Sequence, residues 1–361
     1  MDITINELGQ LTPDSYILLD MRGDVEVGHG IIPGAIHMSK EEILEKYSGG
    51  LVKADEAEAA EREDSAEKKL IIYCARGRIS QELAEELRDR GYDAYSLKGG
   101  YTSWLLNEMK NQQADEVCAQ VEKSIRKKFR KNIWCKFTKA INQYELVKEG
   151  DCIAVCISGG KDSMLMAKLF QELKLHNKFP FEVKFVVMDP GYSPENRKVI
   201  EENARKLKIP IHIFESDIFE SVYHIEKSPC YLCARMRRGY LYNFAKELGC
   251  NKIALGHHYD DVIETILMGM LYGAQIQTMM PKLHSTNFEG MELIRPLYLI
   301  REDDIKAWRD YNDLRFIQCA CKFTDTCTTC NNEENQSKRV EIKQLIAEIK
   351  KKNPYVEAHI F

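Results

Sequence analysis

The sequence predicts an α/β protein with two domains, the larger of which contains a parallel sheet covered by helices on both faces. The chain has 361 residues, and roughly 100–200 residues per domain is typical, so this length predicts two domains. Short apolar runs alternate with helix-length segments in the first 110 residues and again from residue 150. Strands that alternate with helices indicate parallel sheets, which bind ligands at the carboxyl ends of their strands.

The first domain is expected over residues 1–112. Its apolar runs have the length and composition of strands, and a helical pattern lies near 79–90. The expected strands are Tyr16–Asp20, Leu70–Cys74 and Ala94–Leu97. These elements predict a small α/β domain.

A basic helical stretch is expected over residues 113–149. Its basic residues include Lys127, Lys128, Arg130 and Lys131, and they are interleaved with Phe129, Trp134 and Phe137. Such a pattern can bind the phosphate backbone of a nucleic acid. It fits equally well a linker helix with a solvated basic face and aromatic side chains in the core, so the pattern alone leaves both interpretations open.

The second domain is expected over residues 150–361, with strands and helices in alternation. The expected strands are Cys152–Ile157, Val183–Met188, Ile211–Phe214 and Lys252–Leu255. The expected helices lie near 162–176, 194–207, 231–248 and 260–272, and a basic surface helix is expected over 337–352. This order predicts a parallel sheet.

Composition excludes several classes of protein. No run approaches the ~20 apolar residues of a membrane span, and the first residues lack the pattern of a secretion signal. We therefore expect a cytoplasmic protein without membrane contact, in which the twelve cysteines are thiols and the clustered ones serve metal binding or catalysis. The cysteines expected to be bystanders are Cys118, Cys135, Cys152, Cys156 and Cys250.

The net charge of −5 is a sum of unlike parts. Residues 1–116 carry 13 basic and 24 acidic side chains, whereas the remainder carries 38 basic and 32 acidic ones. An acidic first part and a basic second part indicate that only the second meets nucleic acid.

Cys74 lies between a strand and the start of a helix. Backbone N–H groups and the helix dipole at such a position stabilise a thiolate, and Arg76 and Arg78 add positive charge. A buried, inert cysteine at a strand end is the competing interpretation. The clustered arginines and Gly77 favour a reactive thiol.

Four motifs in the first domain resemble a single-domain rhodanese over about residues 1–108. They are Asp20-Met-Arg22, the segment from His29 to His37, Cys74-x-x-Gly77-x-x-Ser80 and Gly99-Gly100-Tyr101-x-x-Trp104. The resemblance implies that Cys74 carries sulfur as a persulfide and that Arg22 neighbours its loop. Many members have arginine where this chain has Ile79, and Arg76 and Arg78 are the charges that would replace it.

A phosphate-binding loop is expected at Ser158-Gly-Gly-Lys-Asp-Ser163, between a strand and a helix. Glycines let the backbone approach a ligand, and the free N–H groups of a helix start bind phosphate. The spacing differs from the Walker pattern of P-loop proteins.

This loop resembles the pyrophosphate loop of N-type ATP pyrophosphatases, whose fold is that of the adenine nucleotide alpha hydrolases. The resemblance implies adenylation chemistry, with Lys161 and Asp162 as catalytic residues and Asp261 holding Mg²⁺ or orienting the nucleotide. The residues it assigns to ATP are Ser158, Gly159, Gly160, Lys161, Asp162, Ser163, Asp189, His257 and Asp261.

Six cysteines form two groups with metal-ligand spacing. Cys230-x-x-Cys233 opens a predicted helix, and the second group comprises Cys319, Cys321, Cys327 and Cys330. The second group alone fits a closed structural zinc site. Alternatively, Cys230, Cys233 and one downstream cysteine hold three irons of a 4Fe-4S cluster and leave the fourth iron open.

The order of these features is similar to that of the tRNA 2-thiocytidine synthetase family over roughly residues 120–350. The resemblance implies a 4Fe-4S cluster on Cys230, Cys233 and Cys319, although Cys321, Cys327 and Cys330 stay open as the third ligand, and an additional Zn²⁺ site stays open too. Arg237 and Arg238 are expected to join the basic stretch in binding RNA phosphates.

Together these features predict ATP-dependent tRNA thiolation. The enzyme is expected to adenylate the C2 oxygen of an anticodon-loop cytidine and to replace it with sulfur, which a cysteine desulfurase or a small-molecule donor supplies to Cys74. Transfer within one chain and transfer between the chains of a homodimer both stay open. The alternatives are 2-thiouridine synthesis, lysidine synthesis, and a cluster-based sulfur or redox sensor.

Overall fold

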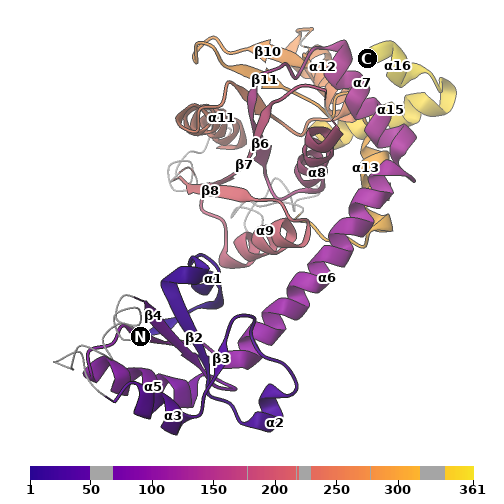
Figure 1. Ribbon diagram of the computed structural model, residues 1–361. Coiled ribbons are helices and arrows are strands. Elements are labelled where there is room, and N and C mark those ends of the chain that lie inside the picture. The colour runs from indigo at the N-terminus through magenta and orange to yellow at the C-terminus, as the bar shows by residue number, and fades with distance from the viewer. Residues whose placement is uncertain (49–67, 177, 217, 219–228, 277, 318–337) are drawn as a thin grey trace. The chain divides into compact units, whose positions relative to one another are not determined.

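The computed structural model describes the chain except for residues 49–67, 177, 217, 219–228, 277 and 318–337, and except for the side chains of residues 229–234. It consists of two compact units, Met1–Gln113 and Ala114–Phe361 (Figure 1). Helix α6 (Gly100–Arg126) begins in the first unit and ends in the second. Each unit has its own sheet and its own core.

The first unit is built on a five-stranded parallel sheet with the strand order β1-β5-β4-β2-β3. Its strands are β1 (Asp2–Ile3), β2 (Tyr16–Asp20), β3 (Ile36–His37), β4 (Lys69–Tyr73) and β5 (Ala94–Leu97). Its shorter helices are α1 (Ile5–Leu8), α2 (Asp24–Val27), α3 (Lys40–Lys46) and α5 (Arg78–Asp89), with a 3-10 turn at Pro13–Ser15. The three predicted strands and the helix are confirmed within one or two residues. The two-residue strands β1 and β3 were not predicted.

Strand β4 shows why the apolar run of this unit forms a central strand. Leu70 and Ile72 pack in one core cluster with Leu83 of α5, whereas Ile71 and Tyr73 pack in a second cluster that contains Leu97. Because successive side chains of a strand point to opposite faces, a strand covered on both sides must be apolar throughout. The four side chains are fully buried.

The second unit contains a six-stranded sheet with the strand order β10-β11-β9-β6-β7-β8. The strands are β6 (Cys152–Ile157), β7 (Glu182–Asp189), β8 (Ile211–Glu215), β9 (Lys252–Ala254), β10 (Lys282–His284) and β11 (Glu292–Ile294). The expected strands are confirmed, but the expectation of a wholly parallel sheet is wrong at one edge, where β10 is antiparallel to β11. Both strands have only three residues and carry polar side chains, so no apolar run marks them.

Helices cover both faces of this sheet (Figure 1). They are α7 (Cys135–Gln143), α8 (Lys161–His176), α9 (Pro194–Lys206), α11 (Pro229–Glu247), α12 (Tyr259–Gly273), α13 (Glu302–Tyr311), α15 (Lys338–Lys352) and α16 (Val356–Ile360), and a π-helical turn, η2, spans Arg130–Trp134. Val155 of β6 belongs to the cluster that holds α8, α9 and α13, whereas Ala154 belongs to the cluster that holds α11. Among the described residues, no helix is long and apolar enough to cross a membrane.

The strand order places a switch point beside β6. After β6 the chain runs to β7 on one side, and it later returns as β9 on the other side. The segments that leave the carboxyl ends of β6 and β9 therefore diverge, which opens a crevice where α/β sheets bind ligands. The two segments touch, since a Cβ atom added to Gly256 would lie 3.3 Å from the backbone nitrogen of Ser163.

Candidate functional site

Cys74 lies in a tight loop between β4 and α5. The N–H of Gly77 donates to the Cys74 sulfur at 3.1 Å, and the Ser80 hydroxyl donates to it at 3.5 Å. Gly77 has a φ of 85°, a conformation that glycine adopts without strain. A Cβ atom on Gly100 would collide with the Cys74 carbonyl oxygen, so glycine is required where the two segments meet.

The loop favours the thiolate form of Cys74. Burial raises the pKa of a thiol, but hydrogen bonds from the Ser80 hydroxyl and from the backbone N–H groups of Ser80, Arg76 and Gly77 outweigh it, so the pKa of Cys74 lies below its ordinary value. The Arg76 and Arg78 side chains are exposed. Hydrogen bonds, rather than the charges of these arginines, account for the shift.

Arg22 lies near the Cys74 loop and contacts it through a neighbouring tyrosine. Its guanidinium pairs with Asp20 at 2.6 Å and lies 3.6 Å from the centre of the Tyr101 ring. The N–H of Tyr101 in turn donates to the Cys74 carbonyl oxygen at 2.9 Å. Arg22 therefore contacts the cysteine loop indirectly, through Tyr101.

A cavity of about 390 Å³ lies at the switch point of the second unit. The segment after β6, the segment after β9, helix α11 and the end of β7 all line it. The polar residues among them are Ser158, Asp162, Ser163, Tyr192, Arg237, Arg238, His257 and Asp261. Several residues that the sequence assigned to ATP thus come together, although they lie up to a hundred residues apart in the chain.

Hydrogen bonds within the loop after β6 hold its two serines together. Ser163 accepts from the N–H of Ser158 at 3.2 Å and donates to the Gly160 carbonyl at 3.0 Å. Gly159 has a φ of 82°, and a Cβ atom there would lie 2.6 Å from Ile200 and Ile317. The loop ends at Lys161, where α8 starts and its free N–H groups favour an anion.

Two buried polar atoms in the cavity wall have no hydrogen-bond partner among the described residues. They are Oδ1 of Asp162 and Nδ1 of His257. Burial, followed by the charge of Arg295, lowers the pKa of His257 to about 4, so its imidazole is neutral at neutral pH. Because an unsatisfied buried polar atom is costly, this wall is suited to a polar ligand.

Gly160 and Lys161 border a second hollow, of about 710 Å³, on the other side of the loop. Lys306, Arg309 and Arg315 contribute its remaining cationic groups. The two hollows share Asp162. The residues expected to hold ATP are therefore divided between two cavities that meet at this aspartate.

Asp189 lies at the end of β7 but does not line the cavity. Its carboxylate accepts from the N–H groups of Gly191 at 2.9 Å and Tyr192 at 2.7 Å, and it lies 3.3 Å from Arg197. It thereby shapes the turn that brings Tyr192 to the cavity, while Met188 lines the wall beside it.

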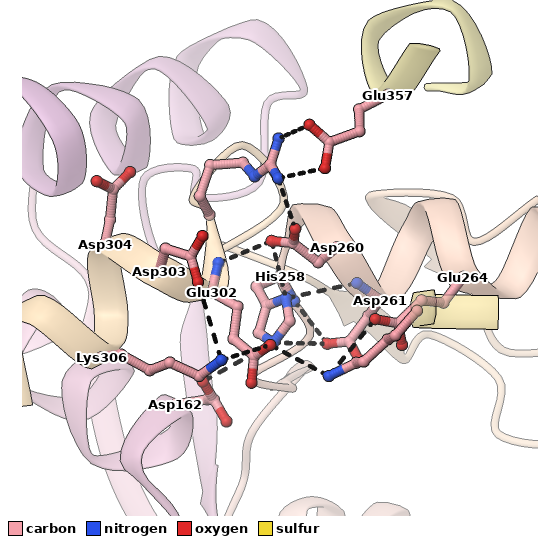
Figure 2. Close-up of polar contacts among 12 residues, drawn as sticks. Asp162, His258, Asp260, Asp261, Glu264, Glu302, Asp303, Asp304, Lys306 and Glu357 are labelled. Carbon is pink, nitrogen blue, oxygen red and sulfur yellow. Dashed lines mark hydrogen bonds and ion pairs between the residues drawn. The ribbon is translucent and has the colours of Figure 1, made fainter. Parts of the chain in front are cut away.

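A network of charged residues borders the site on the side of α12 and α13 (Figure 2). The carboxylate of Asp261 accepts from the backbone N–H of His258 at 3.0 Å, and that of Asp260 accepts from the N–H of Glu302 at 2.7 Å. In the described part of the chain, no group of three His, Cys, Asp or Glu residues is arranged to hold a metal ion. The role of Asp261 in holding Mg²⁺ stays a prediction.

The residues expected to bind RNA lie in two places. Lys127, Lys128, Arg130 and Lys131 are exposed, whereas Phe129 and Phe137 are buried in the main core. The two phenylalanines therefore pack the fold, and the basic side chains form the outer face. Arg237 and Arg238 line the switch-point cavity, where their charge faces the predicted nucleotide site.

The expected cluster ligands are only partly described. Cys230 and Cys233 lie in the first turns of α11, with their side chains outside the described residues, and the downstream cysteines lie outside them altogether.

Cys156, which the sequence marked as a bystander, lines the cavity. Burial raises the pKa of this thiol to about 12, so it is an unreactive wall residue. Its place in an apolar strand carried no signal.

Replacing Ser80 with alanine should raise the pKa of Cys74, because the thiolate loses the hydroxyl that donates to it. Below the new pKa less thiolate is present, so alkylation at pH 7 should slow several-fold. Rates of Cys74 modification by iodoacetamide, measured from pH 5 to 10 by peptide mass spectrometry, report the shift. Ser103→Ala serves as the control, and an identical pH profile in Ser80→Ala would contradict the assignment.

Gly159→Ala should weaken the binding of a non-hydrolysable ATP analogue by tenfold or more. The positive φ and the collision with Ile200 and Ile317 each oppose a side chain there, and backbone strain of this kind costs about 1–3 kcal/mol. Gly160→Ala is the matched comparison, since its Cβ atom would meet nothing closer than 3.7 Å. Calorimetric titration measures both, and equal losses would argue against the strain at Gly159.

Comparisons with known proteins assign both units. A model of the PP-loop domain matches residues 129–327, and a model of the rhodanese-like domain matches residues 4–107. A solved structure of the U34-tRNA thiolase NcsA from Methanococcus maripaludis with its [4Fe-4S] cluster is similar at 21% identity and a TM-score of 0.49. The match covers 62% of this chain and 74% of that one.

Two named relatives are similar over 60% or more of the chain. The tRNA-cytidine(32) 2-sulfurtransferase of Chromohalobacter salexigens is 35% identical, and the match covers 63% of this chain and 78% of that protein. The protein of the same name from Burkholderia cenocepacia is 36% identical, and the match spans 60% of this chain and 63% of that protein. The chain therefore belongs to the PP-loop family that includes the tRNA-cytidine(32) 2-sulfurtransferases, and it also carries a rhodanese-like domain.

Proposed function

We propose that this protein is an ATP-dependent tRNA thiolase that replaces the C2 oxygen of an anticodon-loop cytidine with sulfur. The observation that carries the proposal is the switch-point cavity, in which Asp162 and His257 each present a buried polar atom that has no hydrogen-bond partner among the described residues. The names of the relatives support the choice of tRNA and of sulfur.

The first step is adenylation of the base. The C2 oxygen of the cytidine attacks the α-phosphorus of ATP, and pyrophosphate leaves. The N–H groups at the start of α8 and the side chain of Lys161 would hold the phosphates, while Arg237 and Arg238 would balance negative charge across the cavity. The neutral imidazole of His257 would offer a hydrogen bond without adding charge.

The second step replaces the activated oxygen. A sulfur nucleophile adds at C2, and AMP departs with the original oxygen. Cys230 and Cys233 precede Arg237 and Arg238 on the same helix, so a group that they bind would lie near one wall of the cavity. A 4Fe-4S cluster with one open iron would supply a site for sulfide there.

Cys74 would carry the sulfur that reaches this site. Its thiolate, favoured by the hydrogen bonds of its loop, attacks the outer sulfur of a donor persulfide, which leaves the donor as a thiol and Cys74 as a persulfide. A cysteine desulfurase or a small thiol persulfide is the class of donor. A cellular dithiol, which becomes a disulfide, would supply the two electrons that release the outer sulfur of Cys74 as sulfide. The exposed basic face of residues 127–131 would hold the tRNA backbone.

Deletion of the gene should remove 2-thiocytidine from the tRNA of its host, and the intact gene should restore it. Mass spectrometry of nucleosides from purified tRNA measures the modification. Asp162→Asn should fail to restore it, because that carboxylate lies where the two cavities meet. An unchanged 2-thiocytidine level would refute the substrate, and loss of 2-thiouridine instead would reassign the base.

Anaerobically purified protein should contain close to four iron and four sulfide per chain. Cys230→Ala should lose most of both, because a cluster with three thiolate ligands cannot spare one. Iron and acid-labile sulfide assays give the result, with the exposed Cys135 changed to alanine as the control. A colourless protein that holds only zinc would rule out the cluster.

Cys74→Ala should slow thiolation at least tenfold when a persulfide donor supplies the sulfur, yet leave thiolation with free sulfide within about twofold. The reason is that free sulfide needs no carrier thiol. Both rates come from purified full-length protein with ATP and tRNA. Equal loss with the two sulfur sources would contradict the carrier role.

A further inference from the structure

The carboxylate of Glu302 lies between lysines from three helices. At the start of α13 it meets Lys161 of α8 at 3.2 Å, Lys306 of its own helix at 3.2 Å and Lys343 of α15 at 3.1 Å. Figure 2 shows Glu302 inside this charged network, beside Lys306 and below His258. Neither sequence motif includes Glu302, and the steps proposed above do not use it.

Lys161 has two carboxylates as partners in this structure. Its ammonium lies 3.1 Å from Asp162 and 3.2 Å from Glu302. A phosphate is an anion too, so it competes with Glu302 and Asp162 for the single positive charge and the three N–H groups of Lys161. The strength of the contact with Glu302 therefore enters the free energy of nucleotide binding.

Glu302 remains charged at every physiological pH. Burial raises the pKa of a carboxyl group, but the hydrogen bond from Lys343 and the charges of Lys161 and Lys343 outweigh it and lower the pKa of Glu302 to about 2. Lys161 is only one of the three lysines that lower this pKa, so the carboxylate keeps two cationic partners when Lys161 turns towards a phosphate. Lys306 and Lys343 are the cations that stay beside it.

Helix α15 supplies this remaining charge from outside the loop. Lys343 reaches Glu264 at 3.6 Å as well as Glu302, and Arg339 lies 3.0 Å from Glu264 and 3.5 Å from Asp261. Glu264 is only 2% exposed, and burial raises its pKa to about 7 although Lys343 and Arg339 lower it. The two cations of α15 thus connect Asp261 at the cavity to the carboxylate that pairs with Lys161.

We propose that Glu302 is a positioning residue for Lys161, and that Lys343 determines how readily Glu302 releases Lys161 to the phosphates of ATP. The nucleotide-free protein holds the lysine against Glu302, and binding of ATP exchanges that contact for a phosphate while Lys343 balances the carboxylate. The proposal rests on the use of ATP in the proposed function, but it does not depend on tRNA or on sulfur.

This exchange predicts that changes at Glu302 and at Lys343 alter the affinity for the nucleotide in opposite directions. Glu302→Gln removes the anion that competes for Lys161, so a non-hydrolysable ATP analogue should bind about three- to tenfold more tightly, while turnover falls because the lysine is no longer held in place. Lys343→Gln leaves Glu302 dependent on Lys161, so the analogue should bind about three- to tenfold more weakly.

The test is calorimetric titration of the analogue into nucleotide-free full-length protein. The set comprises the two single variants, the double variant, and Glu302→Gln in a Lys161→Gln background, with thermal melts to confirm folding. In the double variant Lys343→Gln should add less than twofold, and without Lys161 the effect of Glu302→Gln should disappear. Glu348→Gln and Lys351→Gln are the controls, since both residues are exposed on α15, five and eight residues after Lys343.

The outcomes separate the two proposals. If the wild-type chain does not bind the analogue, the proposed function fails at its first step. If it binds but both single variants change affinity in the same direction, or if Glu302→Gln acts equally without Lys161, the positioning role is overturned. A loss of stability alone would shift the melting temperature without producing opposite signs or a dependence on Lys161.

Discussion

The contact between the segments that follow β6 and β9 is the constraint on which the second unit depends. Gly256 lies so close to the start of α8 that a Cβ atom there would be 3.3 Å from the Ser163 nitrogen. That approach exists only because β9 pairs with β6 directly, on the side opposite to β7. It brings His257 and Asp261 to the same cavity as Ser158 and Asp162, and it leaves room for a ligand between the diverging segments.

The site of each unit lies at the start of a helix, but the groups that surround the two sites differ. In the first, backbone N–H groups and one hydroxyl surround a sulfur atom, and the arginines of the loop remain in solvent. In the second, the start of a helix and several cations face a cavity where two buried polar atoms have no hydrogen-bond partner in the described part of the chain. Each site stands at the carboxyl end of a strand, where a glycine with positive φ lets the chain turn into a helix. The acidic composition of the first unit and the basic composition of the second accord with the roles proposed for them, a carrier of sulfur and a binder of RNA.

The central strands and their loops could be predicted because the polarity of their residues matches the burial of each position. An apolar run such as β6 is stable only when both of its faces are buried, and Gly159 and Gly160 mark the turn that follows it. The hairpin of β10 and β11 could not be predicted, since three polar-rich residues per strand carry no periodic signal. The resemblance placed Asp189 at the nucleotide, and the structure adds that one of its carboxylate oxygens holds the local turn, so its role with ATP stays a prediction.

By itself the sequence determined the longer strands and helices and their succession along the chain, the two loops and the cysteine spacing, because each is a local pattern of a few neighbouring residues. Only the tertiary structure decided which side chains meet. It divided the phosphate-loop residues between two cavities, turned Arg237 and Arg238 towards one of them, and placed Glu302 and Lys343 beside Lys161. Those contacts join residues from four helices, and their pairing depends on strand order and helix packing, which no local pattern encodes.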